Sequence, residues 1–467
     1  MNRIARRSMA LLLVVALMLG GIIFFVVEYF IKADTWVLTS GSPHVYNAGP
    51  QKPEPEYTEV ARPNIGCGVI TDRDGILLLD TNDGMVYSKL ATLRKSSIHW
   101  VGDRRGNISA PAVSTYAEEL VGYDPVNGLY QYSGSGQAQL TLSAKVQMVA
   151  LEALGDNKGT VAVYNYKTGE ILCAVTTPTF DPDNVPENVG TLDGVYVNRF
   201  TRACYTPGSI FKIVTTAAAL EEIPDIREQT FQCTGTYDFA DGSDPVTCEK
   251  VHGELSFADA MAQSCNCAYA SIVEQLGPQK LQAYVEKYQV LESVRFDGIT
   301  TKTGNFNIQD AGDNQIAWSG IGQHKDQINP CTYMTFMGAI ANGGAAVQPY
   351  LVSQVTCGGE VTYSAETTTA EAVLPAEVAA ELQTMMRNNV EVKYGAENFP
   401  GLTVCAKSGT AQSDNKASNA LFAGFVTDEE YPLAFIVVVE EGGYGRHACV
   451  PIISEVLAAC KEVMDNE

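Results

Sequence analysis

The sequence predicts an α+β fold in which one antiparallel sheet is flanked by helices. Two β-rich hairpin patterns lie far apart in the chain, at residues 160–166 with 171–177 and at residues 421–427 with 433–440. The stretch between them consists mostly of segments with helical periodicity and of loops. Strands near both ends with helices between them indicate a sheet that sequence-distant hairpins complete.

Length and composition are typical of an ordered protein with two or three domains. The chain has 467 residues, of which 46% are hydrophobic and 18% are charged, so it can bury a large core and general disorder is excluded. Its formal net charge is −23. Because phosphate binding needs clustered lysines and arginines, we expect no nucleic-acid partner.

The N-terminus predicts a membrane anchor. Three arginines precede an uncharged, mostly apolar run at residues 9–27, which would span about 28 Å as a helix and so match the hydrocarbon core of a bilayer. Arginines on this side place residues 1–8 in the cytoplasm and the bulk of the chain outside it. A cleaved signal peptide is the alternative, but the run ends at Glu28 without a small-x-small cleavage site.

Residues 28–138 predict a linker followed by a small β-rich module. Residues 33–63 are polar and contain prolines, which is typical of a linker. Residues 64–78 have the pattern of a strand, an Asp-Gly turn and a second strand. The Gly-, Asn- and Asp-rich composition of residues 101–136 predicts loops of the same module.

Residues 139–467 contain the predicted sheet and its helices. Ser143 is suited to cap a helix that runs to about Leu154. The turn sequence at residues 167–170 joins the first two strands into a hairpin. Residues 451–464 carry apolar side chains at helical spacing and predict a last helix.

Twelve cysteines are many for an exported protein. There is no C-x-x-C pair and the histidines do not fall at zinc spacing, so we expect neither a metal nor a cofactor. Cys233 and Cys248 bracket a polar loop and are the best candidates for a disulfide, whereas the other cysteines are expected to be small buried residues. His252, His324 and His447 are isolated in the sequence and are expected to be structural or surface residues.

Three short motifs predict the chemistry of the chain. Lys212 follows Ser209 at i+3, on the same face of a predicted helix start. A serine hydroxyl becomes a good nucleophile when a base takes its proton, and a lysine can be that base only when neutral. Burial or a second cation, such as Lys407, would lower its pKa enough. The motifs are Ser209-Ile210-Phe211-Lys212, Ser264-Cys265-Asn266 and Lys407-Ser408-Gly409-Thr410.

The motif set and its order resemble the S-x-x-K, S-x-N and K-[ST]-G signature of penicillin-binding proteins and related β-lactamases. The residues around Ser209, from Asn198-Arg199 to Tyr205-Thr206-Pro207-Gly208, are also similar to that family. The pattern G-x-I-T-D-R-D-G-x-x-L within residues 64–78 resembles the opening of the non-catalytic pedestal in monofunctional (class B) members. In place of the His-x-Trp-Phe string often seen after the third motif, the chain has Ser-Asn-Ala-Leu-Phe at residues 418–422.

The resemblance implies a serine-transpeptidase fold and a role for each motif residue. Ser209 would be the nucleophile, and Ser264 would relay a proton to the leaving amine. Gly409 would let the substrate backbone approach closely, and the backbone N–H groups of Ser209 and Thr410 would form the oxyanion hole. The expected catalytic residues are Ser209, Lys212, Ser264 and Lys407, and the expected substrate-binding residues are Asn266, Ser408, Gly409 and Thr410.

The implied activity is that of a peptidoglycan D,D-transpeptidase, a single-pass enzyme of the bacterial cell membrane with its catalytic domain outside. Ser209 would attack the penultimate D-alanine carbonyl of a stem peptide, and an amine of a neighbouring stem would take the acyl group. β-Lactams would acylate the same serine as substrate mimics. The segment before residue 139 is too short for an extra glycosyltransferase domain, so we expect a class B protein that works beside a SEDS-type membrane glycosyltransferase.

Two alternatives remain open from the sequence. One is another enzyme of the same fold, either a D,D-carboxypeptidase, in which water replaces the acceptor amine, or a β-lactamase. The other is non-enzymatic: a β-lactam sensor, or a scaffold in a division or sporulation complex.

Overall fold

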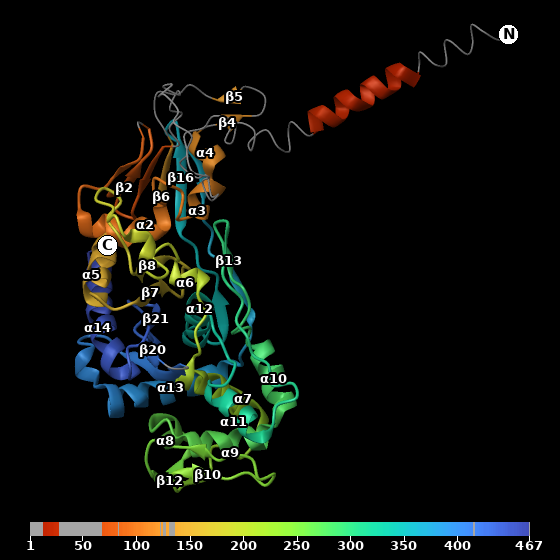
Figure 1. Ribbon diagram of the computed structural model, residues 1–467, viewed down its shortest axis with the longest axis vertical. Helices are drawn as coiled ribbons and strands as arrows, with labels where there is room; N and C mark the ends of the chain where they lie inside the picture. The colour runs from red at the N-terminus through yellow and green to blue at the C-terminus, as the bar shows by residue number, and fades with distance from the viewer. Residues whose placement is uncertain are drawn as a thin grey trace, which may run out of the picture.

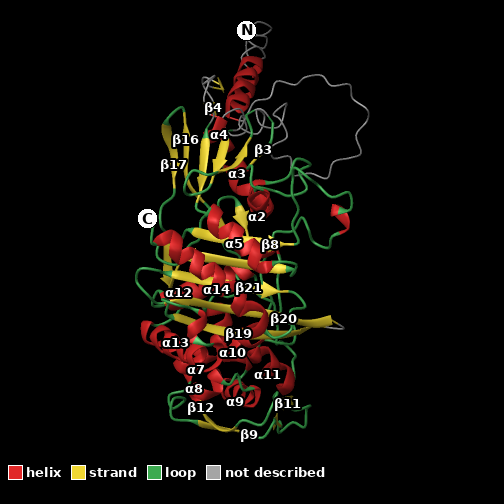
Figure 2. Ribbon diagram, turned by 90° about the vertical axis from the view of Figure 1, so that its left-hand side faces the viewer, coloured by secondary structure: helices red, strands yellow, loops and turns green. Residues whose placement is uncertain are grey.

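A computed structural model describes residues 13–27, 68–82, 84–121, 123–124, 128–129, 136–413 and 416–466. It contains a five-stranded sheet between helices and, beyond one end of it, a six-stranded sheet (Figures 1 and 2). This arrangement confirms the predicted α+β fold with an antiparallel sheet flanked by helices.

The five-stranded sheet has the order β19-β20-β21-β7-β8, and all neighbouring strands run antiparallel. Its outer hairpins come from opposite ends of the chain, and Val437 of β21 pairs with Val161 of β7. The two predicted hairpins and their pairing are therefore confirmed. The strands are β7 (Gly159–Asn165), β8 (Ile171–Thr177), β19 (Val404–Ser413), β20 (Lys416–Val426) and β21 (Leu433–Val439).

Helices cover both faces of this sheet, which explains why every residue of β7, β8 and β21 is buried. On one face, α5 (Ala144–Leu154) and α14 (Gly445–Met464) pack together on the strands, as Figure 2 shows. On the other face lie α12 (Pro330–Ala341) and α13 (Ala376–Asn389). The Ser143 hydroxyl accepts a hydrogen bond from the backbone N–H of Val146 at 3.5 Å, so the predicted cap of α5 is confirmed.

The last helix begins six residues before the predicted start at Pro451, which lies inside α14. The predicted start is too late because Gly445, Arg446 and His447 interrupt the apolar pattern before Cys449 and Val450, which are buried in the core. A Cβ atom on Gly445 would lie 2.3 Å from the Gly409 carbonyl oxygen, so the helix starts directly beside the third motif.

The six-stranded sheet has the order β17-β16-β6-β1-β2-β3. It contains the predicted strand–turn–strand, whose described part starts at Gly68. The sheet extends beyond the expected pedestal at residues 28–138, because two of its strands come from residues 352–364. Residues 352–357 are only partly buried and residues 360–364 are mostly exposed, so their sequence lacks the apolar run of a buried strand. The strands are β1 (Val69–Thr71), β2 (Leu77–Asp80), β3 (Val86–Tyr87), β6 (Gln137–Leu140), β16 (Val352–Cys357) and β17 (Glu360–Ser364).

The prediction of loops throughout residues 101–136 is wrong for two short helices, α3 (Pro111–Thr115) and α4 (Ala117–Val121). Pro111 occupies the first turn of α3, where its missing N–H costs no hydrogen bond. They follow α2 (Ala91–Val101), and the described part of this region also holds β4 (Tyr123–Asp124) and β5 (Gly128–Leu129).

Residues 13–27 form a helix (red in Figure 1). The first four residues of the expected membrane span, the expected cytoplasmic tail at residues 1–8 and the expected linker at residues 33–63 lie outside the described residues. Within the described part of the chain, no helix has both the length and the apolar character needed to cross a membrane.

The other described elements include those that carry the first two motifs. They are α6 (Arg199–Arg202), α7 (Lys212–Glu222), β9 (Thr230–Cys233), β10 (Thr236–Tyr237), β11 (Val246–Thr247), β12 (Gly253–Ser256), α8 (Phe257–Ala262), α9 (Asn266–Leu276), α10 (Pro278–Lys287), β13 (Arg295–Phe296), β14 (Ile299–Thr300), α11 (Asp313–Ile321), β15 (Ala345–Val347), β18 (Thr369–Ala372), the 3-10 turns η1 (Val189–Thr191), η2 (Gly208–Phe211) and η4 (Ala396–Asn398), and the π-turn η3 (Val390–Tyr394).

Candidate active site

Ser209 lies in the 3-10 turn η2, which leads directly into α7. The preceding Gly208 has φ +55°, and a Cβ atom there would lie 2.6 Å from the carbonyl oxygen of Thr410. Only glycine therefore allows the turn to press against β19 in this conformation. The backbone N–H of Gly208 also donates to the Gly322 carbonyl at 2.7 Å, which fixes the turn from the other side.

The third motif lies on β19, which runs past the turn that carries Ser209. A Cβ atom on Gly409 would lie 2.6 Å from the carbonyl oxygen of Pro207, so a second glycine is needed for the same close approach. The Gln323 side chain donates to the Thr410 carbonyl oxygen at 3.1 Å. The first and third motifs are thus held side by side through backbone contacts.

The second motif occupies the turn between α8 and α9 and brings the two buried lysines together. Lys212 Nζ donates to the Ser264 carbonyl oxygen at 2.7 Å and to Asn266 Oδ1 at 2.7 Å, and lies 3.2 Å from Ser264 Oγ. Lys407 Nζ donates to the same Ser264 Oγ at 3.0 Å and to the Ser408 carbonyl oxygen at 2.8 Å. One serine hydroxyl therefore connects the lysines of the first and third motifs.

Burial lowers the pKa of both lysines. The side chain of Lys212 is fully buried, which lowers its pKa to about 8. The pKa of Lys407 is held well below its ordinary value by burial and, second, by the charge of Lys212. Of the two causes expected from the sequence, burial is the larger one for Lys212, and the two lysines also lie close enough to share Ser264 Oγ.

The structure does not join Ser209 to Lys212 directly. Among the described residues, nothing forms a hydrogen bond with the Ser209 hydroxyl, and the Lys212 amine is directed to Ser264 and Asn266 instead. Ser209 is half-buried, whereas Lys212 lies deeper. The site therefore has a partly exposed serine hydroxyl in front of a buried lysine amine.

Sequence reasoning missed Tyr394, which organises the third motif. Its hydroxyl accepts the backbone N–H of Ser408 at 2.8 Å and lies 3.0 Å from Ser408 Oγ. The Thr410 hydroxyl accepts a longer bond of 3.4 Å from the backbone of Gly445. No local pattern marks Tyr394, because it belongs to a π-turn separated from the motif in sequence.

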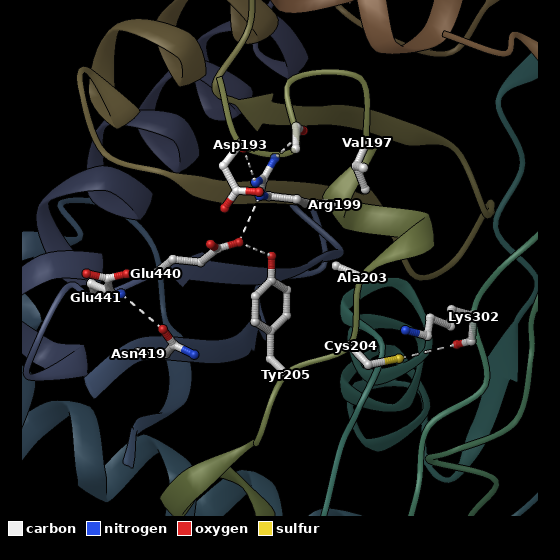
Figure 3. A pocket seen from close by; sticks show the side chains of 11 residues that line it. Asp193, Val197, Arg199, Ala203, Cys204, Tyr205, Lys302, Asn419, Glu440 and Glu441 are labelled. Carbon is white, nitrogen blue, oxygen red and sulfur yellow. Dashed lines mark hydrogen bonds and ion pairs between the residues drawn. The ribbon is translucent and has the colours of Figure 1, made fainter. Parts of the chain in front are cut away.

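A polar pocket of about 400 Å³ lies beside the loop that leads to Ser209, and it contains none of the eight expected site residues (Figure 3). At its centre, Glu440 Oε1 accepts hydrogen bonds from the Tyr205 hydroxyl at 2.9 Å and from Arg199 Nε at 2.8 Å. Both partners belong to the family-like stretch before Ser209, so Glu440 ties that stretch to the end of β21. The pocket is lined by Asp193, Gly194, Val197, Arg199, Ala203, Cys204, Tyr205, Lys302, Asn419, Glu440 and Glu441.

We expect Glu440→Ala to lower the free energy of unfolding by about 2–3 kcal/mol, since it leaves the buried Arg199 guanidinium without its counter-ion. Urea denaturation of the purified protein measures this loss. Glu455→Ala, at an exposed position on α14, is the matched control and should change the unfolding free energy by less than about 0.5 kcal/mol. Equal effects of the two substitutions would contradict the anchoring role of Glu440.

Comparison with known proteins places the chain in a family. Residues 159–458 match the penicillin-binding protein transpeptidase domain, which is more than half of the chain. The chain belongs to the penicillin-binding protein transpeptidase family. It is accordingly a serine-type D,D-transpeptidase, and the resemblance of the three motifs is confirmed at the level of family and fold.

Three known proteins illustrate this similarity. The peptidoglycan D,D-transpeptidase PbpA of Mycolicibacterium smegmatis is 28% identical over 341 residues, which cover 66% of this chain and 68% of that protein. The crystal structure of the D,D-transpeptidase domain of a peptidoglycan glycosyltransferase from Eggerthella lenta has a TM-score of 0.73 and 26% identity, with 85% of this chain and 98% of that one covered. A structure of a peptidoglycan synthase complex that coordinates polymerization and crosslinking has a TM-score of 0.61 and 25% identity, with 71% and 64% covered.

Proposed function

We propose that this penicillin-binding protein cross-links peptidoglycan stem peptides through an acyl-enzyme on Ser209. The observation that carries the proposal is the convergence of the three motifs: the Ser209 turn touches the Gly409–Thr410 backbone, and Ser264 Oγ lies between the two buried lysines. A serine with a buried amine of lowered pKa behind it and two backbone donors beside it is suited to acyl transfer.

In the proposed reaction, Ser209 Oγ attacks the penultimate D-alanine carbonyl while its proton passes to the neutral Lys212 amine. The backbone N–H groups of Ser209 and Thr410 stabilise the oxyanion, each contributing about 2.7–4 kcal/mol. Ser264 passes the proton on to the leaving D-alanine amine as the peptide bond breaks. An acceptor amine then attacks the acyl-enzyme, and Ser209 regains its proton as the new amide forms.

The substrate contacts are proposed for the remaining motif residues. Tyr394 engages the Ser408 hydroxyl, so Thr410 is the better placed of the two to donate to the substrate carboxylate. The Asn266 amide nitrogen donates to the Thr247 carbonyl oxygen at 2.9 Å, and its oxygen accepts from Lys212. Asn266 therefore orients the substrate peptide bond from a fixed position, and Gly409 leaves room for the substrate backbone.

β-Lactams are the proposed inhibitors of the same serine. Their strained amide presents a carbonyl to Ser209, and the ring carboxylate takes the place of the substrate carboxylate near Thr410. The leaving nitrogen stays attached after ring opening, so the acyl-enzyme persists.

We further propose residues 1–8 as a cytoplasmic tail, residues 9–27 as a membrane anchor, residues 28–138 as a linker and pedestal, and residues 139–467 as the transpeptidase domain. The pedestal sheet also takes in residues 352–364. The apolar run after three arginines supports this orientation. The similarity to a peptidoglycan synthase complex that couples polymerization to crosslinking supports a SEDS-type membrane glycosyltransferase as the partner.

An assay with a stem pentapeptide and a D-amino-acid acceptor tests the proposed activity. The acceptor product should form in preference to the hydrolysed tetrapeptide and should vanish in Ser209→Ala. Hydrolysis alone would instead indicate a D,D-carboxypeptidase. Rapid turnover of penicillin would indicate a β-lactamase, and the absence of any peptide turnover would favour a sensor or scaffold.

We expect acylation by penicillin to become faster as pH rises through about 8, because deprotonation of Lys212 generates the base. At pH 7 a lysine of this pKa is neutral in about a tenth of the molecules, against roughly 0.04% for an ordinary lysine. The rate constant should rise nearly tenfold per pH unit at low pH and level off above about pH 9. Stopped-flow acylation across this range measures it, and a flat profile would contradict a titrating base with this pKa.

A further inference from the structure

Four cysteines from residues 233–267 gather beside the second motif. The Sγ atoms of Cys233, Cys248, Cys265 and Cys267 all lie within 4.8 Å of one another. Cys233 ends β9, Cys248 follows β11, and the last two flank Asn266 at the start of α9. The structure does not form the predicted Cys233–Cys248 disulfide, because all of the described cysteines have free thiols.

The geometry of this cluster fits a tetrahedral metal ion. Zinc–thiolate bonds of about 2.3 Å place the sulfurs of a tetrahedral site roughly 3.8 Å apart, and Cys248 Sγ lies 3.9 Å from Cys265 Sγ. A disulfide needs only two sulfurs to approach each other, whereas here all four do so at once. Three of the four side chains are almost completely buried, so the cluster is shielded from water.

Two polar groups outside the four cysteines lie beside their sulfur atoms. The backbone N–H of Asn266 donates to Cys248 Sγ at 3.3 Å, and His252 Nδ1 lies 3.4 Å from Cys248 Sγ and 3.5 Å from Cys233 Sγ. His252, isolated in the sequence, thus lies at the edge of the cluster in space.

In the surrounding fold, such an ion would have a structural role as a cross-link. The cluster sits in the lobe at the lower end of Figure 1, which holds the two-stranded pairs β9–β12 and β10–β11 beside α8 and α9. Small lobes with little regular structure commonly need an added cross-link. A cross-link here would join the lobe to both residues that flank Asn266.

We propose that Cys233, Cys248, Cys265 and Cys267 bind one zinc ion, and that this ion fixes the turn that carries Ser264 and Asn266. Binding exchanges the thiol protons for Zn²⁺ and involves no oxidation or reduction, leaving four zinc–sulfur bonds. Sulfur-only tetrahedral sites favour Zn²⁺ among common divalent ions. The binding of zinc by these four cysteines does not depend on the proposed function. The proposed effect of the ion on Ser264 and Asn266 does rest on that function.

Metal analysis of the purified full-length protein tests the ligand set without reference to activity. We expect one zinc per chain, lost in Cys233→Ser and in Cys265→Ser but retained in Cys357→Ser, which removes a cysteine outside the cluster on β16. Replacing zinc by Co²⁺ in the wild-type protein should produce the visible bands of tetrahedral cobalt with thiolate ligands. This measurement does not depend on whether the serine variants fold.

A second measurement tests the effect on the turn. Chelation of the wild-type protein should lower its acylation rate by penicillin about 10–100-fold, and zinc should restore it, with circular dichroism used to confirm that the fold persists.

Iron in place of zinc, two disulfides by intact mass, or zinc retained in both cluster variants would overturn the ligand set. Unchanged acylation in the zinc-free protein would overturn the positioning role alone, and loss of acylation in the zinc-loaded wild type would count against the proposed function instead.

Discussion

Lys212→Met will lower the rate constant for acylation by penicillin about 10³–10⁴-fold, because it removes the buried amine that is proposed to take the proton from Ser209. Methionine has a similar length, so the packing around the position is largely kept. The Ser264 carbonyl and Asn266 Oδ1 each lose a donor, so a fall in stability of about 1–3 kcal/mol accompanies the loss of activity.

Stopped-flow acylation with a chromogenic β-lactam measures this effect, and thermal unfolding shows whether the variant is folded. Lys95→Met is the matched control, because Lys95 is an exposed lysine on α2. A folded Lys212→Met protein with more than a tenth of the wild-type rate would show that another group takes the proton.

Ser264→Ala and Ser264→Gly will reduce acylation by the same factor, about 10²–10⁴-fold, because both remove the hydroxyl shared by Lys212 and Lys407. Their stabilities will differ. Ser264 has φ +54°, a left-handed conformation that costs a residue with a Cβ atom about 1 kcal/mol or more relative to glycine.

Comparing the two variants therefore separates the effect of losing the hydroxyl from the effect of the left-handed backbone conformation. We expect Ser264→Gly to be about 1 kcal/mol more stable than Ser264→Ala in urea denaturation, with equal acylation rates. If the glycine variant acylated much faster than the alanine variant, backbone placement rather than the hydroxyl would explain the role of this position.

The sequence predicted the elements whose signals are local. The hairpins of the central sheet, the Ser143 cap and the order of the three motifs each depend on a few neighbouring residues, and the structure shows the hairpins and the cap. The motif strings also indicated which strand faces the nucleophile, and Gly208 and Gly409 supply the close backbone contact.

The features that the sequence did not reveal depend on contacts between distant segments. The strands β16 and β17 join the six-stranded sheet through β6, more than two hundred residues earlier, and no local pattern marks that pairing. Glu440 and Tyr394 look like ordinary residues until the fold brings them to Arg199 and Ser408.

The cysteine cluster was missed for a related reason. Spacing rules for metal sites look for two close pairs such as C-x-x-C, whereas here the fold brings two single cysteines, Cys233 and Cys248, to one C-x-C pair at Cys265 and Cys267. Cys233 and Cys248 are predicted to form a disulfide because they bracket a polar loop, whereas the structure places both of them, as free thiols, beside Cys265 and Cys267.

Intact mass spectrometry after exposure to benzylpenicillin tests the central claim most directly. We predict one covalent adduct per chain, located on the peptide that contains Ser209, and none in Ser209→Ala. An adduct that persists in Ser209→Ala, or the absence of an adduct on the folded wild-type protein at any penicillin concentration, would contradict the assignment of Ser209 as the nucleophile.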